Sequence, residues 1–555
     1  MKACTRIRSG HEVQLTRVLA GVLLFLSATS QATAAGIPSD RPNILWLVVE
    51  DMSPWLPCYG DETVPTPNLD RFAAQSIRYT QAFASSPVCA PARSSLITGM
   101  YATRIGTMHM RTGKPSAAAV AKDPEAYASI PSYEGVPPDF VRCFPEHLRA
   151  AGYYCTNASK TDYQFRAPAT VWDQSNGKAH WRKRPEGAPF FAVFNHGGTH
   201  ESQAFPDAKR RPVAVTPEDV PIPPLYPDTE AVRDAMARTY NNIAAMDVWV
   251  GQRLAELDEA GLADDTVVFF YSDHGVGLPR GKRSPYDLGT RVPLLVRLPD
   301  GSDAGTDEER VVSFVDFGPS VLSLTGIEPD KRLDGIAFLG PFVREGSGFA
   351  FTHADRFDGV YDKARSVSDG RYRYVRNLQT DIPHLIGNAY RERIAMTQDL
   401  YDLRPTDAAH ATRWQTASTK RPAEELYDSQ SDPWELSNQV DAPEMQQTLL
   451  RLRAALDGWV EDTGDLGLLA DEQEMVAAHL WPDLKQPATA PIEHERNGDV
   501  LHLSCQTEGA SIGYRTADGG AWSIYSNPIS VESLKSIEVL AHRIGYSPAK
   551  RRIEL

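Results

Sequence analysis

The sequence predicts an α/β fold with a mainly parallel central sheet flanked by helices. Three short apolar runs, at residues 44–49, 190–194 and 266–271, have the length and composition of buried strands. Helix-like segments separate these runs, at residues 66–76, 144–151 and 230–260. Strands that alternate with helices along a chain are typical of a parallel sheet covered by helices.

Polar residues follow each apolar run. Glu50 and Asp51 come after the first run, His196 comes shortly after the second, and Asp273 and His274 come shortly after the third. In α/β proteins, ligands bind beyond the carboxyl ends of the strands. These residues are therefore candidates for a functional site.

The pattern changes from about residue 350. Strand-like stretches at residues 372–375, 400–403 and 426–428, with an amphipathic helix at 445–460, predict a smaller α+β subdomain with an antiparallel sheet. Pro482, Pro487 and Pro491 predict a linker, and residues 500–555 read as alternating strands with turn signals at 518–520 and 527–528. We expect an α/β catalytic domain over residues 36–350, the subdomain over 351–480, and a linker with a small β-sandwich-like module over 481–555.

The first 35 residues have the features of a signal peptide. Lys2, Arg6 and Arg8 precede an apolar run at residues 18–26, and small residues suited to cleavage follow at 32–35. The run is short for a membrane span, although an uncleaved anchor is the alternative interpretation. We expect export to the periplasm or the medium, with no membrane span after cleavage.

Length and charge exclude several classes of protein. The 555 residues are enough for two to four domains, and the net charge is −15. An acidic chain without interleaved basic and aromatic clusters is not expected to bind nucleic acid. An anionic substrate would need a locally basic pocket.

The six cysteines contain no CxxC pair, so a structural zinc site is not expected. Cys4 would leave with the leader, and an odd number remains. In an oxidising compartment this suggests that one cysteine has another function. Cys143 and Cys155 are the favoured disulfide pair.

The strongest motif begins at Cys89. Pro91 and Arg93 follow at offsets two and four, and Leu96, Thr98 and Gly99 complete a Leu-x-Thr-Gly sequence. The first three residues form the recognition pattern for conversion of cysteine to formylglycine. Here the chain resembles the type I sulfatases of the alkaline-phosphatase-like superfamily; the alternative is an ordinary buried or disulfide cysteine.

The resemblance extends over residues 40–465. Residues 157–165, 194–202 and 426–438 look most like bacterial relatives of heparan N-sulfatase. Residues 509–546 resemble the C-terminal β module of some chitobiase-type hexosaminidases, which could either pack against the enzyme or contact sugar.

The resemblance implies a formylglycine hydrate at Cys89 that attacks sulfur. It also implies a divalent cation, calcium in most relatives, which would be held by oxygen-rich ligands. The candidate ligands are Glu50, Asp51, Asp273, His274 and residue 89. The chain departs from the commonest pattern, since relatives usually have Asp-Asp at 50–51 and often Asp-Asn at 273–274, so Glu50 could lie outside the ligand set and His274 could change the metal preference.

Cations and an acid are expected around the sulfate. Arg93, Lys160 and Lys282 match the family's basic residues. His200 matches the histidine that donates to sulfate or protonates the leaving group, with His196 as the second choice.

Four further residues are candidates for substrate binding. Asp162 replaces the histidine of the family's Gly-Lys-x-His motif, which leaves the role of that histidine open. His109 lies close behind the nucleophile helix, and Asp355 and Arg356 belong to a charged stretch that resembles a substrate loop. A solvated loop is the alternative for the last three.

Together these features predict an exported sulfatase that acts on a sulfated saccharide, by S–O cleavage or by S–N cleavage of an N-sulfate. A formylglycine-generating or anaerobic sulfatase-maturating enzyme would be its partner. The alternative is a phosphodiesterase or phosphonate monoester hydrolase of the same superfamily. A non-catalytic carbohydrate-binding protein is a third interpretation, disfavoured by the intact Cys89 and both metal carboxylates.

Overall fold

The computed structural model describes residues 41–113, 124, 130–402, 420–517 and 519–555. The predicted signal peptide lies outside these residues. Residues 36–555 form one compact unit. Within the described part of the chain, no helix is both long and apolar enough to cross a membrane.

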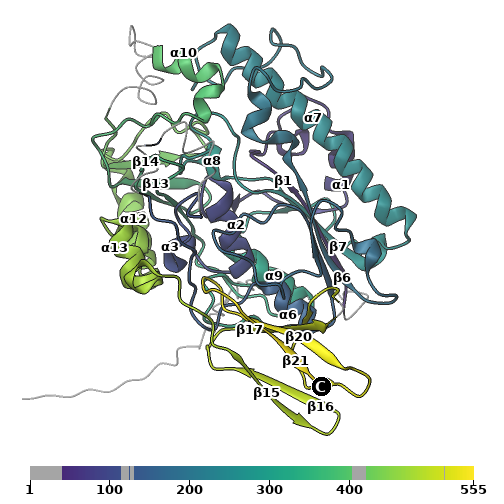
Figure 1. Ribbon diagram of the computed structural model, residues 1–555. Helices are drawn as coiled ribbons and strands as arrows, with labels where there is room; N and C mark the ends of the chain where they lie inside the picture. The colour runs from purple at the N-terminus through teal and green to yellow at the C-terminus, as the bar shows by residue number, and fades with distance from the viewer. Residues whose placement is uncertain (1–40, 114–123, 125–129, 403–419, 518) are drawn as a thin grey trace, which may run out of the picture. The chain divides into compact units, whose positions relative to one another are not determined.

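An eight-stranded sheet forms the centre of the structure (Figure 1). Its strands, in spatial order, are β5 (Gln174–Ser175), β4 (Tyr154–Ala158), β6 (Phe190–His196), β1 (Asn43–Val49), β7 (Thr266–Ser272), β8 (Leu294–Arg297), β2 (Ile77–Tyr79) and β9 (Asp307–Glu308). The strands from β5 to β7 are parallel, whereas β8 is antiparallel to both β7 and β2. The predicted mainly parallel sheet is confirmed, and the three predicted runs are β1, β6 and β7.

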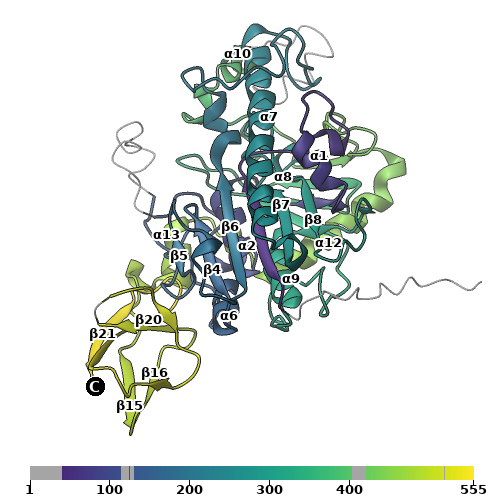
Figure 2. The ribbon, with the colours of Figure 1, turned by 90° about the vertical axis from the view of Figure 1, so that its right-hand side faces the viewer.

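Helices cover both faces of this sheet. Figure 2 shows α7 (Glu230–Glu259) lying along β6 and β7, and α1 (Pro67–Ala73) packs in the same apolar cluster. The other cluster contains α2 (Cys89–Thr98), α6 (Phe144–Ala150) and α9 (Phe317–Leu324).

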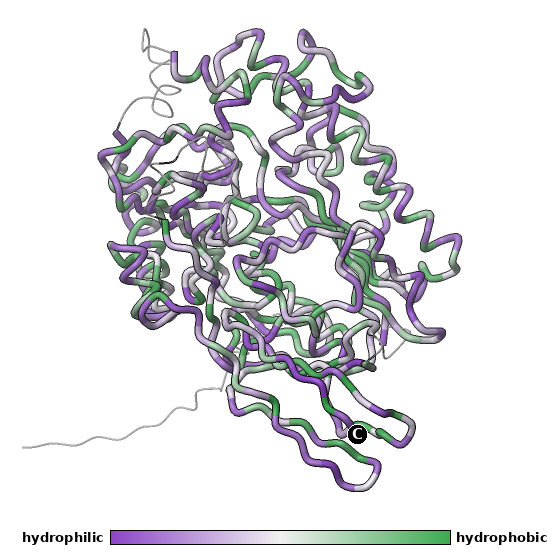
Figure 3. Tube along the Cα trace, in the orientation of Figure 1, coloured by the Kyte–Doolittle hydropathy of each residue, from purple (hydrophilic) through white to green (hydrophobic). Residues whose placement is uncertain are grey.

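Successive residues of β1 alternate between the two clusters. Leu45 and Leu47 pack with α7, while Ile44 and Trp46 pack with α2, α6 and α9. The whole of β1 is buried, and the apolar colouring of the central strands in Figure 3 follows this burial. A strand with two apolar faces has a strongly specified register, which fixes the position of the residues that follow it.

The next part of the chain forms an antiparallel sheet, as predicted. Its strands, in order, are β11 (Ala350–Ala354), β12 (Ala364–Ser368), β13 (Tyr372–Asn377) and β14 (Glu424–Asp428). Helix α12 (Gln446–Thr463) packs on it through Leu449, Leu452 and Leu456. The strand predicted at residues 400–403 is wrong, because α10 (Met396–Asp402) is helical and buries Leu400 in the α7 cluster.

Two small antiparallel sheets form the C-terminal module. One contains β15 (Ile492–Asn497), β16 (Val500–Cys505) and β19 (Ile529–Ser530); the other contains β18 (Ser523–Ile524), β17 (Ser511–Thr516), β20 (Ser536–His542) and β21 (Ala549–Glu554). The predicted alternation is present, but β15 lies in the stretch that was expected to precede the strands. Because the three parts of the chain form separate sheets, we propose that the domains divide at the predicted boundaries.

The predicted disulfide is absent. Each of the five cysteines in the described residues is a free thiol, including Cys143 and Cys155. Cys143 precedes α6 and Cys155 lies on β4, where its Sγ is 3.8 Å from the carbonyl oxygen of Pro145. Both thiols are buried in the apolar cluster of α6, where they pack as small apolar side chains without a cross-link.

Candidate active site

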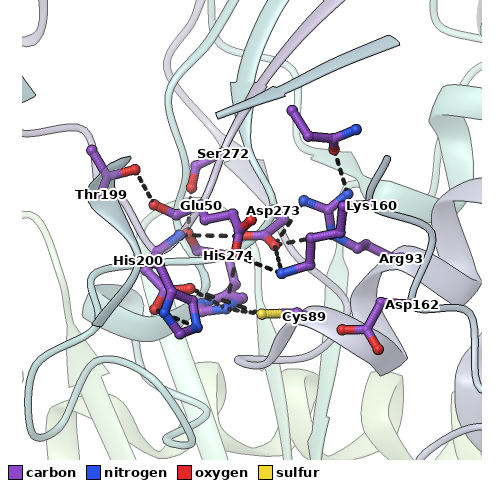
Figure 4. A network of polar contacts seen from close by, with 12 residues as sticks. Glu50, Cys89, Arg93, Lys160, Asp162, Thr199, His200, Ser272, Asp273 and His274 are labelled. Atoms are coloured by element: carbon purple, nitrogen blue, oxygen red, sulfur yellow. Dashed lines mark hydrogen bonds and ion pairs between the residues drawn. The ribbon is translucent and has the colours of Figure 1, made fainter. Parts of the chain in front are cut away.

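The candidate nucleophile, Cys89, is the first residue of α2. All residues of this helix are buried, and Arg93 lies about one turn further along it. Sγ of Cys89 lies 3.3 Å from Nε2 of His274 and 3.9 Å from Oδ1 of Asp51. The structure therefore brings the predicted nucleophile to the carboxyl ends of β1 and β7 (Figure 4).

Asp51 and Asp273 meet because β1 and β7 are parallel neighbours. Val49 pairs with Ser272, and the backbone N–H of Asp51 donates to Oδ1 of Asp273 at 3.1 Å. Both side chains are buried. Asp51 has a φ of 53°, a left-handed conformation that non-glycine residues rarely adopt and that is typical of functional turns.

Two overlapping groups of four side chains could each hold a metal ion, and one of them joins Glu50 and His200 to Asp51 and Cys89. Ligand atoms of Asp51, Cys89, Asp273 and His274 all lie within 4.8 Å of one another. Burial alone would lower the pKa of His274, but the charges of Asp273 and Asp51 raise it to about 10. A site that draws a proton onto a buried imidazole attracts positive charge, and its carboxylates suit a hard divalent cation. The residues present therefore fit such an ion.

Glu50 and Lys160 form a pair next to this cluster. Nζ of Lys160 lies 2.5 Å from Oε2 of Glu50 and 4.0 Å from Oδ2 of Asp273. Burial opposes the charge of Lys160, yet negative charge at Cys89, Asp273 and Glu50 raises its pKa. Lys160 is therefore a cation held against the carboxylates of Glu50 and Asp273.

Arg93 is held between two strand ends. Its Nε and one terminal nitrogen lie 3.1 and 3.0 Å from Oδ2 of Asp273, and its other terminal nitrogen donates to Oδ1 of Asn195 at 2.8 Å. Asn195 was not among the predicted site residues. Its place directly before His196 at the end of β6 was the available signal.

Lys282 lies between two buried carboxylates. Its Nζ is 2.7 Å from Oδ2 of Asp51 and 3.0 Å from Oε1 of Glu201. Glu201 also pairs with Arg283 at 2.8 Å, and its backbone N–H donates to Asp51 at 2.7 Å. Glu201 was missed from the sequence, where only its position next to His200 drew attention to it.

The ring of His200 lies beside Lys282. Its Nε2 is 3.3 Å from Nζ of Lys282, and the backbone N–H of Ser202 donates to its Nδ1 at 3.3 Å. Burial and the charge of Lys282 lower the pKa of His200. His196 instead packs against Trp249, with ring centroids 4.8 Å apart, which favours His200 as the residue that reaches a substrate.

The predicted substrate-binding residues lie in two environments. Asp162 points into the space beside Cys89 (Figure 4). Its carboxylate pairs with Arg111 at 2.9 Å. His109 and Arg356 are buried and bonded to each other, since the backbone N–H of Arg356 donates to Nδ1 of His109.

Asp355 and Arg356 belong to buried ion pairs. Asp355 is bonded to His353 and Arg365, and the guanidinium of Arg356 pairs with Glu472 through two contacts of 2.8 Å. Side chains that are fully buried and paired are not placed to contact a substrate. Direct substrate binding by Asp355 and Arg356 stays a prediction, and their buried pairing favours a role in support of the surrounding loops.

Positively and negatively charged side chains both lie near the position of the nucleophile. Lys160, Lys282 and Arg93 supply positive charge around Cys89, while the carboxylates lie behind it on the strand ends. Fixed cations in a buried site stabilise negative charge more strongly than cations in water. This arrangement suits attack on a tetrahedral anion.

Comparisons with known proteins identify the family of the chain. The sulfatase family model matches residues 42–327. An ulvan-active sulfatase from Formosa agariphila is 40% identical over an alignment of 560 positions that covers 94% of this chain and 92% of the relative. Human N-sulphoglucosamine sulphohydrolase is 27% identical, over 78% of this chain and 92% of that protein.

Solved structures agree on the fold. A protein in complex with its substrate D-glucosamine-2-N,6-O-disulfate has a TM-score of 0.52 at 16% identity, over 78% of this chain and 100% of that chain. A phosphonate monoester hydrolase from Silicibacter pomeroyi has a TM-score of 0.54 at 15% identity, over 77% of this chain and 96% of that chain.

The fold and the family match define a hydrolase of the alkaline-phosphatase-like class. The chain belongs to the sulfatase family, and it is a sulfuric ester hydrolase. The predictions of fold, family and enzyme class are confirmed.

Proposed function

We propose that this enzyme removes sulfate from a sulfated saccharide, with residue 89 as the nucleophile after conversion of Cys89 to formylglycine. The observation that carries the proposal is the position of Cys89 at the start of α2, 3.9 Å from Asp51 and 3.3 Å from His274. The similarity to an enzyme named for its action on ulvan supports a sulfated polysaccharide or its oligosaccharides as the substrate class. The similarity to N-sulphoglucosamine sulphohydrolase keeps S–N cleavage as a second reaction of the same site.

Asp51, Asp273, His274 and residue 89 would hold a divalent cation, which we propose to be calcium, with Glu50 beside them. When bound, this ion would polarise the sulfate oxygens and stabilise the deprotonated nucleophile. A formylglycine hydrate at position 89 would supply one hydroxyl to attack sulfur and a second to release the product sulfate.

The surrounding cations orient the sulfate. Lys160 is held by Glu50 and Lys282 by Asp51, so a sulfate bound at residue 89 would meet both ammonium groups. Lys282 is only 1% exposed, which keeps its ammonium fixed rather than solvated. Arg93 holds the Asp273 carboxylate in place from the side of α2.

His200 is suited to protonate the leaving oxygen. Because its Nδ1 accepts a hydrogen bond from the backbone of Ser202, the neutral ring would carry its proton on Nε2, while the ammonium of Lys282 donates to Asp51 and Glu201. A proton donor at the leaving group matters most when the leaving group is a poor one, such as a sugar hydroxyl.

Export by the predicted leader and maturation by a formylglycine-generating or anaerobic sulfatase-maturating enzyme complete the proposal. The test is expression with such a maturation enzyme, followed by measurement of sulfate release from ulvan oligosaccharides, N-sulfated glucosamine and para-nitrophenyl sulfate. Phosphate and phosphonate monoesters serve as the competing substrates. Sulfate release with negligible turnover of the phosphorus esters supports the proposal; the reverse preference contradicts it.

A further inference from the structure

An arginine that the predicted site does not include pairs with Asp162, the carboxylate beside the nucleophile. The guanidinium of Arg111 pairs with Asp162 at 2.9 Å, and its side chain is 45% exposed. Its partner Asp162 lies beside Cys89 in Figure 4. Burial opposes the charge of Arg111, but Asp162, Cys89 and Asp358 together raise its pKa. Among the described residues, Asp162 is the one hydrogen-bond acceptor of this guanidinium. A guanidinium has five N–H donors, so several remain for a ligand.

The backbone on both sides of this pair is strained. Arg111 has a φ of 64° and Asp162 a φ of 55°. Non-glycine residues rarely adopt these angles, and they persist where the surroundings impose them, most often at functional sites.

Buried contacts supply that constraint. The backbone N–H of Met110 donates to the carbonyl of Arg356 at 2.8 Å, and the backbone N–H of Arg356 donates to Nδ1 of His109 at 3.1 Å. The Arg356 guanidinium is in turn locked to Glu472 and also donates to the carbonyl oxygen of Met110. The segment that carries Arg111 is therefore anchored to the core at the residue before it.

A gain in folding stability does not explain why Arg111 and Asp162 are held together, since an exposed ion pair contributes little to stability. The charge next to the nucleophile does explain the pairing. A lone carboxylate at position 162 would repel an anionic saccharide next to the nucleophile, and Arg111 cancels that charge while it presents further N–H donors.

We propose that Arg111, oriented by Asp162, binds a second anionic group of the saccharide, either a carboxylate or an additional sulfate, next to the sulfate that is cleaved. The inference rests on the proposed function. It makes Arg111 a determinant of substrate choice, separate from the residues that act on the scissile sulfate.

The test compares Arg111→Gln with the wild type on four substrates. Para-nitrophenyl sulfate and a carboxyl-reduced monosulfated oligosaccharide carry one anionic group; a monosulfated oligosaccharide with a uronate and a disulfated neutral oligosaccharide carry two. We expect kcat/KM to fall about 10- to 100-fold on the uronate or the disulfated substrate, as loss of a charge-assisted hydrogen bond predicts, and to change less than about threefold on the singly charged substrates. The two doubly charged substrates separate carboxylate from sulfate recognition.

Two further variants control the comparison. Arg451→Gln removes an arginine of matching exposure, 46%, whose partner Asp369 is remote in sequence from the site, and it should leave all four rates unchanged. Arg111→Lys should restore part of the lost preference because it retains the charge. Equal loss on all four substrates, or no loss on either doubly charged one, would overturn the inference. If the wild type released sulfate from none of the four, the proposed function itself would fail.

Discussion

Sγ of Cys89 lies 3.3 Å from Nε2 of His274, so the start of helix α2 meets the end of strand β7. The motif at residues 89–93 and the Asp-His pair at 273–274 are far apart in the sequence, and either alone is a weak signal. Their contact ties the candidate nucleophile to the carboxylates that fit a metal ion. The predictions below test the parts of this arrangement separately.

Removal of the metal should abolish turnover. Because a catalytic metal contributes several kcal/mol to the transition state, Asp51→Asn and Asp273→Asn should each lower kcat/KM by a factor of about 1,000 or more. Exhaustive chelation should have the same effect on the wild type, and calcium should restore activity better than magnesium or manganese. The exposed Asp307→Asn is the matched control. Full activity in chelated protein that contains no metal would contradict this prediction.

Loss of Lys282 should affect rate and stability together. Lys282→Met removes the cation between Asp51 and Glu201. We expect kcat to fall about 100- to 1,000-fold, as when one fixed donor to a developing charge is removed. In chelated protein the free energy of unfolding should fall by about 3 kcal/mol, because two buried carboxylates lose their partner.

Steady-state kinetics and urea denaturation check both effects. Lys331→Met, at a lysine whose side chain is 77% exposed, should change neither quantity. A rate within threefold of the wild type for Lys282→Met would show that Lys282 does not contact the substrate.

His200 should matter in proportion to the leaving group. If its Nε2 donates the proton, His200→Ala should lower kcat on a sugar sulfate by about 100- to 10,000-fold. The loss on para-nitrophenyl sulfate should be much smaller, because nitrophenolate leaves without a proton. His196→Ala should show no such dependence, since its ring packs on Trp249. An equal loss on both substrates would exclude His200 as the acid.

His109 should make the fold sensitive to acid. Burial, with Arg356 nearby, lowers the pKa of His109 from 6.5 to about 4. The unfolded chain therefore takes up a proton below pH 6.5 that the folded chain refuses until about pH 4. Stability from the neutral ring is present above pH 6.5 and is lost as the pH falls, by up to about 3 kcal/mol.

Urea denaturation at several pH values between 4.5 and 7 measures this effect. In His109→Gln, whose amide oxygen can still accept from the backbone of Arg356, the slope of stability against pH should be flatter. Identical slopes in the two proteins would show that His109 does not titrate as described.

Local patterns made much of the fold and site predictable. Buried strands such as β1 are continuous apolar runs that can be recognised in the sequence. Asp51 and Asp273 follow two such runs, so their place in the site could be predicted from the sequence. The predicted strand at 400–403 failed because Leu400 is buried by a helix that packs on α7, a tertiary contact that a short apolar run does not reveal.

The site residues that the sequence analysis missed also depend on tertiary contacts. Glu201 is tied to Lys282 and Asn195 to Arg93 across more than 80 residues of sequence, and Arg111 reaches Asp162 from a separate loop. The Cys143–Cys155 pairing failed because sequence spacing does not report the direction of side chains in a packed core.

The central claim is that residue 89 acts as formylglycine. Mass spectrometry of the peptide that contains residue 89, made on preparations with graded amounts of the maturation enzyme, measures the converted fraction alongside the rate of sulfate release. We predict that the rate rises in proportion to the converted fraction and is absent in Cys89→Ala. A fully active preparation in which residue 89 is still cysteine, or an active Cys89→Ala enzyme, would contradict the account.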